Sequence, residues 1–382
     1  MKPLEVQNKL SWLEVSENNI RHNVNEIRRL ISPDVLLAPC VKANAYGHGL
    51  VQMAKLLSEC RVDWLCINSL DEAHRIRNAG VQLPLLILNS LHHDSFDAAI
   101  RLNVRFFLYD LNSAHKLSRV ASRLRIKAKV HVKIDTGMSR QGVLASDYEQ
   151  FMKNVSVLDN VHVEGVATHF ATSDQTNDQD FFKRQLSTFK RIVSIGRNNY
   201  KDISLYHCAN SGAALMFPES HFDLVRTGIS IYGYYPSKEV MIGSQKNGLE
   251  LRPAMSFKTF ISCIKSLPPD SYIGYSNTHR TRRNIRLALL PIGYYDGLDR
   301  KLSNQGYVLI NGSRAPIIGR ISMNITTVDV TDINAYPGDI AVVIGKQDEE
   351  EISADEIASR IDSINYEVIS RLSENIDRVY ST

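Results

Sequence analysis

The stretch VLLAPCVKANAYGHG, residues 35–49, decides how the first half of this chain folds. Val35 to Val41 is an almost unbroken apolar run, which predicts a buried strand, and Lys42 follows directly at its end. Little water reaches an ammonium group in such a place, which favours the free amine that a Schiff base requires. Taken alone, however, the stretch is more typical of a structural lysine that extends from a strand end toward solvent.

Outward from this strand, short β-rich runs alternate with amphipathic helical stretches as far as about Tyr235. One helical stretch, Asp71 to Ala79, stops at Gly80, and another has an apolar stripe at Ile20, Val24, Ile27 and Leu30. Such alternation is typical of a (β/α)8 barrel, with a doubly wound sheet as the alternative. The predicted strands are Val35–Lys42, Asp63–Asn68, Pro84–Leu88, Val104–Tyr109, Ala128–Asp135, Val161–His169, Ile203–His207 and Asp223–Arg226.

The pattern changes after about Ser237 to β-rich segments separated by turn signals. Ile317–Val330 and Ile340–Ile344 are predicted strands, and Ser353 with Glu356 forms a capping-box pattern at the start of a helix. A chain of 382 residues is too long for one ordinary core. We therefore expect an α/β protein with an N-terminal (β/α)8 barrel over residues 1–242 and a mostly β C-terminal domain over residues 243–382.

Composition excludes several classes of protein. Hydrophobic content of 43% and charged content of 23% are typical of globular proteins, and a net charge of +4 spread along the chain argues against nucleic-acid binding. No apolar run approaches the roughly 20 residues that span a bilayer, and Met1–Trp12 lacks the apolar centre of a signal peptide. Five cysteines without Cys-x-x-Cys spacing indicate neither a zinc site nor a disulfide framework. We expect a cytoplasmic protein without a metal site, and we interpret the pair His92-His93 as a surface feature.

Short motifs in both predicted domains narrow the function. They are VKANAYGHG (41–49), HVKIDTGMSR (131–140), THF (168–170), ANS (209–211), VRTGI (225–229), GYS (274–276), GYYDG (293–297), GRISMN (319–324) and NYE (365–367). In this order they resemble the alanine racemases, fold-type III enzymes that depend on pyridoxal 5'-phosphate. The resemblance implies an isomerase that interconverts L-alanine and D-alanine for peptidoglycan synthesis, as a homodimer with shared active sites.

Racemisation removes the α-proton from one face of an amino acid and returns a proton to the other. It therefore needs two bases and an electron sink. The resemblance implies that Lys42 binds the cofactor as a Schiff base and then serves as the base on the D-alanine side. It assigns the L-alanine side to Tyr275 of the partner subunit. Because tyrosine has an ordinary pKa near 10, it needs help to act as a base, and the resemblance assigns that help to His169 and Arg226.

Arg226 is the most diagnostic polar residue of the set. In many pyridoxal enzymes a carboxylate faces the ring nitrogen and keeps it protonated, which makes a deep electron sink. An arginine that faces the ring nitrogen accepts no proton, so the electron sink is shallower and the carbanion has a shorter lifetime. This suits a racemase and argues against the decarboxylases that share the barrel.

The resemblance also assigns binding roles. Phosphate contacts are implied for the side chains of Tyr46, Ser211 and Tyr366 and for the backbone amides of Gly228 and Ile229. The substrate carboxylate is assigned to the planar guanidinium of Arg140 and to the backbone amide of the partner's Met323. Lys133 matches a lysine that is carbamylated in many members, and the substrate entryway is assigned to Tyr294, Arg300 and Arg320.

Two positions depart from the family pattern, and alternatives remain open. Asn324 stands where many relatives have aspartate, and Asp377 precedes Arg378 where a proline is frequent. The first departure leaves room for a broad-specificity or serine racemase, although the retained Tyr366 favours alanine. A barrel decarboxylase is opposed by Arg226. A pyridoxal-phosphate homeostasis protein would resemble the barrel alone, so the β domain with Tyr275 argues against it.

Overall fold

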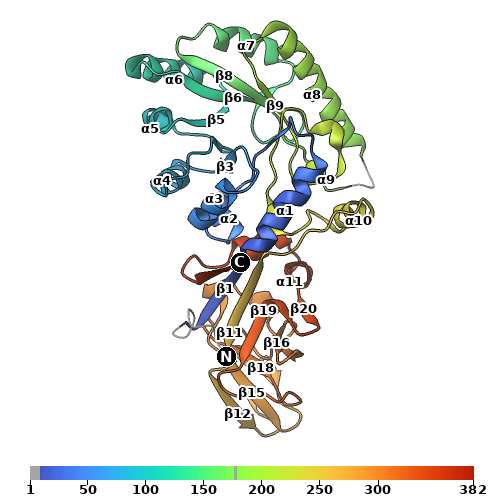
Figure 1. Ribbon diagram of the computed structural model, residues 1–382. Helices are drawn as coiled ribbons and strands as arrows, with labels where there is room; N and C mark the ends of the chain where they lie inside the picture. The colour runs from blue at the N-terminus through green and yellow to red at the C-terminus, as the bar shows by residue number, and fades with distance from the viewer. Residues whose placement is uncertain (1–8, 176–178) are drawn as a thin grey trace. The chain divides into compact units, whose positions relative to one another are not determined.

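The computed structural model describes residues 9–175 and 179–382 (Figure 1). Most of the Met1–Trp12 segment considered above therefore lies outside the described residues. The chain divides into two compact units. We call Asn19–Ala45 with Leu50–Pro253 the barrel unit, and Ala254–Thr382 with Tyr46–Gly49 and the N-terminal residues through Asn18 the strand-rich unit.

Eight parallel strands form the centre of the barrel unit, each within a predicted strand. They are β2 (Leu36–Leu37), β3 (Leu65–Ile67), β4 (Leu85–Ile87), β5 (Val104–Leu108), β6 (Ala128–Asp135), β8 (Val161–Ala167), β9 (Leu205–His207) and β10 (Leu224–Val225). A continuous ladder runs from β3 through β4, β5, β6 and β8 to β9, and β10 pairs in parallel with β2. The ring closes through the bridge Cys40–Cys66 between β2 and β3, and through the hydrogen bond from the amide of Arg226 to the carbonyl of Ala209. The predicted (β/α)8 barrel is confirmed, because a doubly wound sheet would leave open edges.

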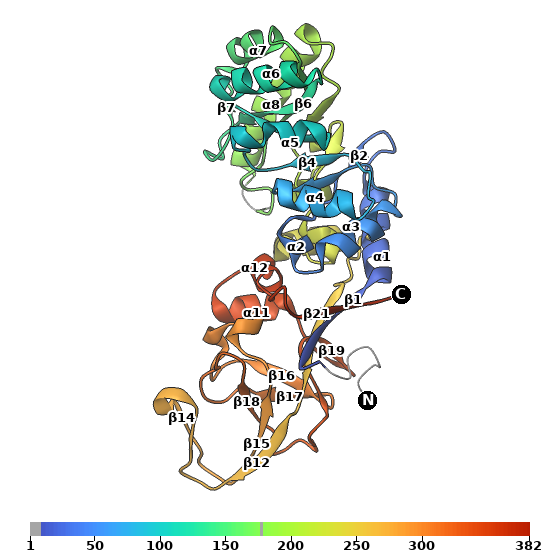
Figure 2. The ribbon, with the colours of Figure 1, turned by 90° about the vertical axis from the view of Figure 1, so that its left-hand side faces the viewer.

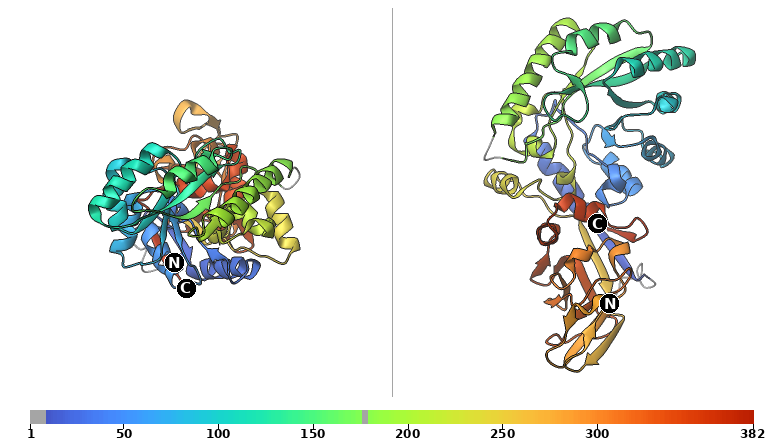
Figure 3. Two further views of the ribbon diagram at one scale, coloured as in Figure 1. Left: turned by 90° about the horizontal axis from the view of Figure 1, so that it is seen from above. Right: turned by 180° about the vertical axis from the view of Figure 1, so that it is seen from behind.

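Helices connect successive strands and lie outside them (Figures 1 and 3). They are α1 (Glu17–Leu30), α3 (Leu50–Ser58), α4 (Leu70–Asn78), α5 (Phe96–Arg101), α6 (Leu111–Leu124), α7 (Tyr148–Ser156), α8 (Asp180–Asn199), α9 (Ser211–Met216) and α10 (Lys238–Lys246). Helix α1 buries Ile20, Val24 and Ile27 of its predicted stripe. Helix α4 ends as predicted, because Gly80 takes the left-handed backbone conformation, with φ +87°, that closes a helix. A short strand, β7 (Val143–Leu144), pairs with β6.

The strand-rich unit is built on a mixed sheet in the order β17-β16-β19-β11-β1-β21, with β20 on β19. Two smaller sheets, β12-β15-β18 and β13-β14, complete it. Its strands are β1 (Ser11–Ser16), β11 (Met255–Phe260), β12 (Cys263–Leu267), β13 (Tyr272–Ile273), β14 (His279–Arg280), β15 (Ile285–Leu290), β16 (Tyr307–Ile310), β17 (Ser313–Pro316), β18 (Thr326–Asp329), β19 (Ile340–Gln347), β20 (Glu350–Ile352) and β21 (Asp377–Ser381). Two helices, α11 (Ala354–Ile361) and α12 (Asn365–Ser370), lie side by side (Figure 2).

Local details of this unit differ from the sequence expectation. The predicted strand Ile317–Val330 is wrong over most of its length, since only Thr326–Asp329 forms a strand and the residues before it form a loop. Ser353 caps α11 by accepting a hydrogen bond from the amide of Glu356 at 3.0 Å, while the Glu356 carboxylate binds Arg314. The expected boundary at residues 242/243 falls inside α10, whereas the units divide at Pro253/Ala254. Among the described residues, no helix is both long enough and apolar enough to cross a bilayer.

Candidate active site

Lys42 follows the first barrel strand, β2 (Leu36–Leu37), after residues 38–41, at the start of a left-handed backbone turn. Non-glycine residues rarely adopt this conformation, which costs roughly 1–2 kcal/mol for each residue. Three hydrogen bonds hold the turn: the amide of Ala43 donates to Glu72 Oε1 (2.9 Å), the amide of Leu50 to Asn44 Oδ1 (2.9 Å), and the amide of Ala45 to the carbonyl of Val41 (2.8 Å). The turn therefore fixes how the chain leaves the strand beside the half-buried Lys42. Its φ angles lie between +53° and +54° at Ala43, Asn44, Ala45 and Tyr46.

Arg226, at the end of β10, is the centre of a buried hydrogen-bond set. Its side chain is 3% exposed, and burial lowers its pKa from the ordinary value. One terminal nitrogen, Nη1, donates to Nδ1 of His207. The other, Nη2, donates to the carbonyls of Thr168 (2.8 Å) and Cys208 (3.1 Å) and lies 3.4 Å from Nδ1 of His169. Within the described part of the chain these bonds leave the Nε–H group of Arg226 for a further acceptor.

His169 follows the end of β8, and its protonation is determined by its neighbours. Burial lowers the pKa of His169 well below its ordinary value, and the positive charges of Lys133 and Arg226 lower it further. The ring is therefore neutral near pH 7. Because a guanidinium group can only donate, Nδ1 of His169 accepts from Arg226 and the ring proton lies on Nε2. His169 thus presents an N–H donor on its other side.

Ser211 and Gly228 form a polar cradle at the C-terminal end of the barrel. The amide of Gly228 donates to Oγ of Ser211 at 2.8 Å, and Ile229 begins the short 3₁₀ helix η4 (Ile229–Tyr232), whose first amides have no helical partner. The hydroxyls of Thr227 and Ser230 flank these amides, are buried, and have no hydrogen-bond partner among the described residues. Such a set of donors suits an anionic group with several acceptor oxygens.

A pocket of the barrel unit contains Arg140, which is expected at the substrate carboxylate, together with Lys133. It is lined by residues that include Lys133, Asp135, Arg140, Thr168 and His169. Lys133 is 6% exposed, its Nζ lies 4.8 Å from the ring centre of Phe107, and burial lowers its pKa well below the ordinary value. The nearby charges of Arg226 and Arg140 lower it further. The free-amine form of Lys133 is therefore more populated than in an ordinary lysine, beside the exposed guanidinium of Arg140.

In the strand-rich unit, three of the sequence motifs meet in a loop cluster formed by Gly274–Ser276, Gly293–Gly297 and Gly319–Asn324. The amides of Tyr294 and Tyr295 donate to the carbonyls of Ser322 (3.1 Å) and Met323 (3.0 Å). A Cβ atom at Gly293 would lie 2.1 Å from the Ser322 carbonyl oxygen, so only glycine permits this approach. A Cβ at Gly274 would lie 3.2 Å from the amide of Arg320, which places the third motif against the same loop.

Several side chains of the loop cluster are exposed. Tyr275 is 69% exposed and Met323 is 54% exposed. Tyr294 and Arg300 line a shared pocket with Asp299 and Arg371, whereas Arg320 and Met323 lie outside it. The two tyrosines expected at the phosphate, Tyr46 and Tyr366, also belong to the strand-rich unit, with their ring centres 6.2 Å apart.

Four buried residues of the barrel interior were not singled out from the sequence. His207 contacts Arg226, His131 contacts His207, and Glu164 binds Arg105 inside the ring of strands. A signal was present, because Lys129, His131 and Lys133 alternate along a strand that should be buried on both faces. Polar residues at every second position of such a strand all point to one side, here the barrel interior.

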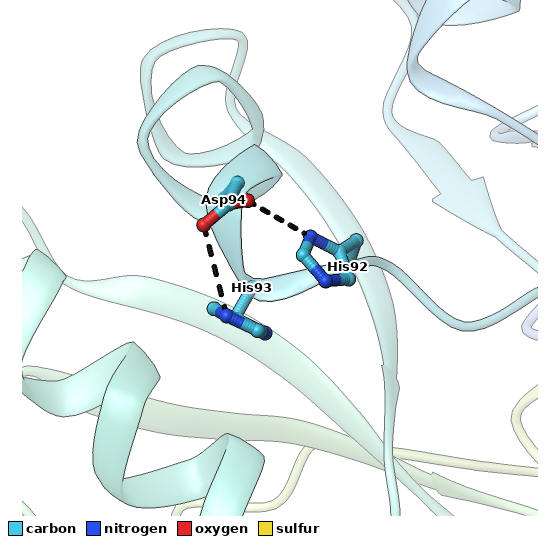
Figure 4. Close-up of side chains that lie close together, drawn as sticks. All are labelled: His92, His93 and Asp94. Carbon is cyan, nitrogen blue, oxygen red and sulfur yellow. Dashed lines mark ion pairs between the residues drawn. The ribbon is translucent and has the colours of Figure 1, made fainter.

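His92, His93 and Asp94 form the one group of three potential metal ligands within residues 9–175 and 179–382 (Figure 4). All three side chains are exposed, and the two imidazoles lie 3.2 Å and 3.7 Å from the Asp94 carboxylate. They are consecutive residues of one loop after β4, and no other element contributes a ligand. This arrangement is that of a surface ion pair.

The donor set at the C-terminal end of the barrel fits pyridoxal 5'-phosphate. Lys42 supplies a primary amine, and Arg226 keeps an N–H for a ring nitrogen. The hydroxyls of Ser211, Thr227 and Ser230 and the first amides of η4 offer donors to a phosphate. Barrel enzymes place their chemistry at this end of the strands. Fold and site together define the class of barrel-type, pyridoxal-phosphate-dependent enzymes.

Comparisons with known proteins narrow the class to one family. The family description "Alanine racemase, N-terminal domain" matches residues 15–236, and "Alanine racemase, C-terminal domain" matches residues 254–380. Alanine racemase 2 of Caldanaerobacter subterraneus subsp. tengcongensis is 40% identical over 370 residues, which cover 96% of this chain and 94% of that protein. The structure of alanine racemase from Bacillus anthracis with bound L-Ala-P is 32% identical, covers 100% of this chain and 96% of its own, and superposes with a TM-score of 0.92. The structure of alanine racemase from Clostridium difficile 630 is 34% identical, covers 98% of this chain and 96% of its own, and has a TM-score of 0.92.

The chain therefore belongs to the alanine racemase family. It is an amino-acid racemase of the isomerase class, and its cofactor is pyridoxal phosphate.

Proposed function

We propose that this chain interconverts L-alanine and D-alanine with two bases, Lys42 on the D-alanine side and Tyr275 of the partner subunit on the L-alanine side. The observation that carries the proposal is the buried Arg226, which donates to His169 and keeps its Nε–H for a ring nitrogen. When bound, pyridoxal phosphate supplies the electron sink for the charge left at the substrate's α-carbon. Because Arg226 keeps its proton and does not give it to the ring nitrogen, the electron sink stays shallow. Return of a proton to the α-carbon then competes well with side reactions.

Lys42 anchors the cofactor and, once released by substrate, takes or returns the proton on one face. Its support is the left-handed turn after β2, which holds the backbone of Lys42 in one direction through bonds to Glu72 and Leu50. A base that must reach one carbon atom benefits from a backbone held in one position, because a displacement of about 1 Å can lower the rate a hundredfold.

Tyr275 serves the opposite face, and His169 assists it. The proposal is supported by the tautomer of His169, whose Nε2–H remains available after Nδ1 has accepted from Arg226. When the Nε2–H of His169 donates to the hydroxyl oxygen of Tyr275 of the partner subunit, this hydrogen bond stabilises the deprotonated form of the phenol. Arg226 thereby serves both the ring nitrogen and, through His169, the second base.

Arg140 binds the substrate carboxylate, with the amide of the partner's Met323 as a second donor. Lys133 is carbamylated in this scheme: the neutral amine attacks carbon dioxide, a C–N bond forms, and one proton leaves to give an anionic carbamate. The lowered pKa of Lys133 supports this reaction, because only the free amine attacks. The anion then pairs with Arg140 and holds its planar group.

The remaining assignments concern the phosphate and the entryway. Tyr46, Ser211 and Tyr366 bind the phosphate through hydroxyl groups, and Gly228 and Ile229 bind it through amides. The shared cradle of Ser211 and Gly228 and the neighbouring rings of Tyr46 and Tyr366 support these roles. Tyr294, Arg300 and Arg320 control entry and restrict the side chain to a methyl group, a role supported for two of them by the pocket that Tyr294 and Arg300 share.

The active enzyme is a homodimer whose two active sites each combine residues of both subunits. The proposal is supported by the loop cluster, which exposes Tyr275 and Met323 instead of packing them within their own unit. Large exposed apolar and aromatic side chains in one cluster are typical of a surface that a partner covers. We place the enzyme in the cytoplasm, where it supplies D-alanine for peptidoglycan.

Subunit mixing tests the proposal. D-alanine formation from L-alanine is measured, with and without added pyridoxal phosphate, for Lys42→Ala and Tyr275→Phe homodimers and for the two variants expressed together. With shared sites, each mixed dimer contains one wild-type site and one doubly altered site, so random assembly restores about a quarter of wild-type activity. Without shared sites the mixture is no more active than its components, which would contradict the proposal.

A further inference from the structure

A column of polar side chains runs through the barrel interior to Arg226. It consists of Arg105, Lys129, Glu164, His131 and His207, in that order, and we call it the polar column. Glu164 accepts from Arg105 at 2.7 Å and 3.1 Å and lies 3.1 Å from Nζ of Lys129. His131 Nε2 lies 3.6 Å from the Glu164 carboxylate, and His131 Nδ1 lies 2.8 Å from His207 Nε2. The centre of such a barrel is usually filled by branched apolar residues.

The hydrogen bonds of the polar column have one direction, which Arg226 determines. Arg226 can only donate, so His207 Nδ1 accepts and the proton of a neutral His207 lies on Nε2. That proton is donated to His131 Nδ1, which places the His131 proton on Nε2, facing Glu164. Arg226 and His207 therefore each donate to the next residue, and the Nε2–H of His131 lies 3.6 Å from the Glu164 carboxylate, close to the anion but beyond hydrogen-bond distance.

The charges of the polar column agree with this direction. Burial lowers the pKa of both His131 and His207, so both rings are neutral near pH 7. Burial alone would raise the pKa of Glu164, but the hydrogen bonds from Arg105 and the nearby Lys129 and His131 outweigh it and keep this pKa well below its ordinary value. Glu164 is therefore an anion, and two neutral imidazole rings lie between it and the cation of Arg226.

The backbone is shaped to make these contacts. In the pairing of β6 with β8, Val130 faces Val163 and His131 faces Gly165, so Glu164 is the extra residue of a β-bulge. A bulge redirects a side chain, and here it leaves Glu164 beside His131. A Cβ at Gly165 would lie 2.9 Å from His131 Nδ1, so glycine makes room for the imidazole. Ser204 holds the bulge through its amide and hydroxyl, each 3.2 Å from the Glu164 carbonyl.

We propose that Glu164 is a positioning residue that acts through His131 and His207 to hold Arg226 as a hydrogen-bond donor for the ring nitrogen of the cofactor. Without the anion, the Nε2–H of His131 would face no negative charge, and the tautomers of His131 and His207 would be held from the Arg226 end alone. His207 would then orient the guanidinium group of Arg226 less firmly. The inference rests on the proposed role of Arg226 and extends it to residues that do not contact the substrate.

The tautomers are the first test, and they require no activity. ¹⁵N–¹H correlation spectra of the histidine side chains are recorded for the cofactor-loaded dimer, with His131→Gln used to assign His131 and His207→Gln to assign His207. We expect both histidines to be neutral with the proton on Nε2. A proton on Nδ1 of either ring, or a doubly protonated ring, would overturn the proposal. This result is independent of whether the enzyme racemises alanine.

A matched pair of variants tests the effect on cofactor binding. His131→Leu keeps the approximate volume but ends the series of hydrogen bonds, whereas His131→Gln can still accept from His207 and donate toward Glu164. We expect the dissociation constant of pyridoxal phosphate, measured by equilibrium dialysis, to rise on the order of tenfold in His131→Leu, as for loss of a hydrogen bond to a charged group. His131→Gln should stay within about threefold of wild type.

Equal dissociation constants in the two variants would mean that His131 only fills space, and the proposal would be rejected. Because Glu164 stays paired with Arg105 and Lys129 in both variants, neither leaves a buried charge alone. A wild-type protein that binds the cofactor but forms no D-alanine would contradict the proposed function, while the two measurements above would still decide the role of the polar column.

Discussion

The barrel unit and the strand-rich unit contribute candidate residues in opposite ways. Around Arg226, the functional side chains are buried or half-buried and held by partners within the same unit, and even the histidine tautomers follow from the hydrogen bonds. In the loop cluster, the backbone is fixed by glycine contacts, but Tyr275 and Met323 extend into solvent. The fixed groups of the barrel unit are suited to stabilising charge that develops during the reaction, whereas the exposed groups of the loop cluster are suited to contact with a partner surface.

Replacement of Lys42 should have the largest effect, because it removes both the cofactor anchor and one base. Lys42→Ala should lose the absorbance band near about 420 nm of a lysine–pyridoxal Schiff base and should lower the rate by at least about a thousandfold. Lys55→Ala on α3, an exposed lysine of the same unit, is the control and should retain both. Survival of the band in Lys42→Ala would end the assignment.

Replacement of Tyr275 should separate the two faces of the substrate. Tyr275→Phe removes one hydroxyl from an exposed ring, so the fold should persist while exchange of the α-proton of L-alanine slows by about 10²–10⁴. Exchange from D-alanine, measured in single-direction deuterium incorporation, should slow far less. Tyr272→Phe, an exposed tyrosine on the neighbouring strand β13, serves as the control. Equal losses in the two directions would contradict the two-base scheme.

The sequence predicted the architecture better than the interior of the site. The alternation of apolar runs and helical stripes was sufficient to predict the eight barrel strands, because both patterns depend directly on which residues are buried. Glu164 could not be placed in the site, since a β-bulge changes the direction of a side chain without changing the pattern of residues. The pairing of strand β1 with β11 and β21 was also hidden, because contacts between distant segments leave no local signal.

Acid should destabilise the barrel unit because its histidines are buried as neutral rings. The folded-state pKa values of His131, His169 and His207 are lowered, so below about pH 6.5 the unfolded chain binds protons that the folded chain does not. The free energy of unfolding should therefore fall as the pH drops from 8 to 5.5, by up to about 1.4 kcal/mol per histidine for each pH unit below 6.5. The stabilisation from Glu164, whose folded pKa is lowered, is lost only at lower pH, below its unfolded value near about 4.3.

Fluorescence of Trp64 can follow this unfolding locally. Trp64 lies 4.9 Å from the Arg105 guanidinium and 5.6 Å from the ring of His131, and the protein's other tryptophan, Trp12, can be replaced by phenylalanine. Urea midpoints are compared at the two pH values in the Trp12→Phe background. His131→Gln should reduce the difference, since it removes one of the three groups. A midpoint that does not move between pH 8 and 5.5 would show that these rings are not neutral when folded.

Carbamylation of Lys133 should have a moderate effect through Arg140. With ¹³C-labelled bicarbonate, the wild-type protein should show a carbamate resonance that disappears in Lys133→Ala and persists in Lys127→Ala, an exposed lysine just before β6. Without the anion, Arg140 is held less firmly, and we expect the KM for alanine to rise roughly tenfold. Absence of the resonance in the wild-type protein would exclude the modification.

The smallest expected effect concerns Asn324, in the exposed loop cluster. Its Nδ2 donates to Asp296 Oδ2 at 3.4 Å, and the same oxygen accepts from the amide of Gly293 at 2.8 Å. Asn324→Asp would place two carboxylates side by side, and because both are near solvent the repulsion should change the KM for alanine by only about threefold. Asn324→Ala removes the hydrogen bond without adding a charge and so isolates the electrostatic part. If the two variants have the same KM for alanine and the same relative rate with L-serine, the charge at this position does not influence selectivity, and the loop cluster acts through its backbone and its aromatic side chains alone.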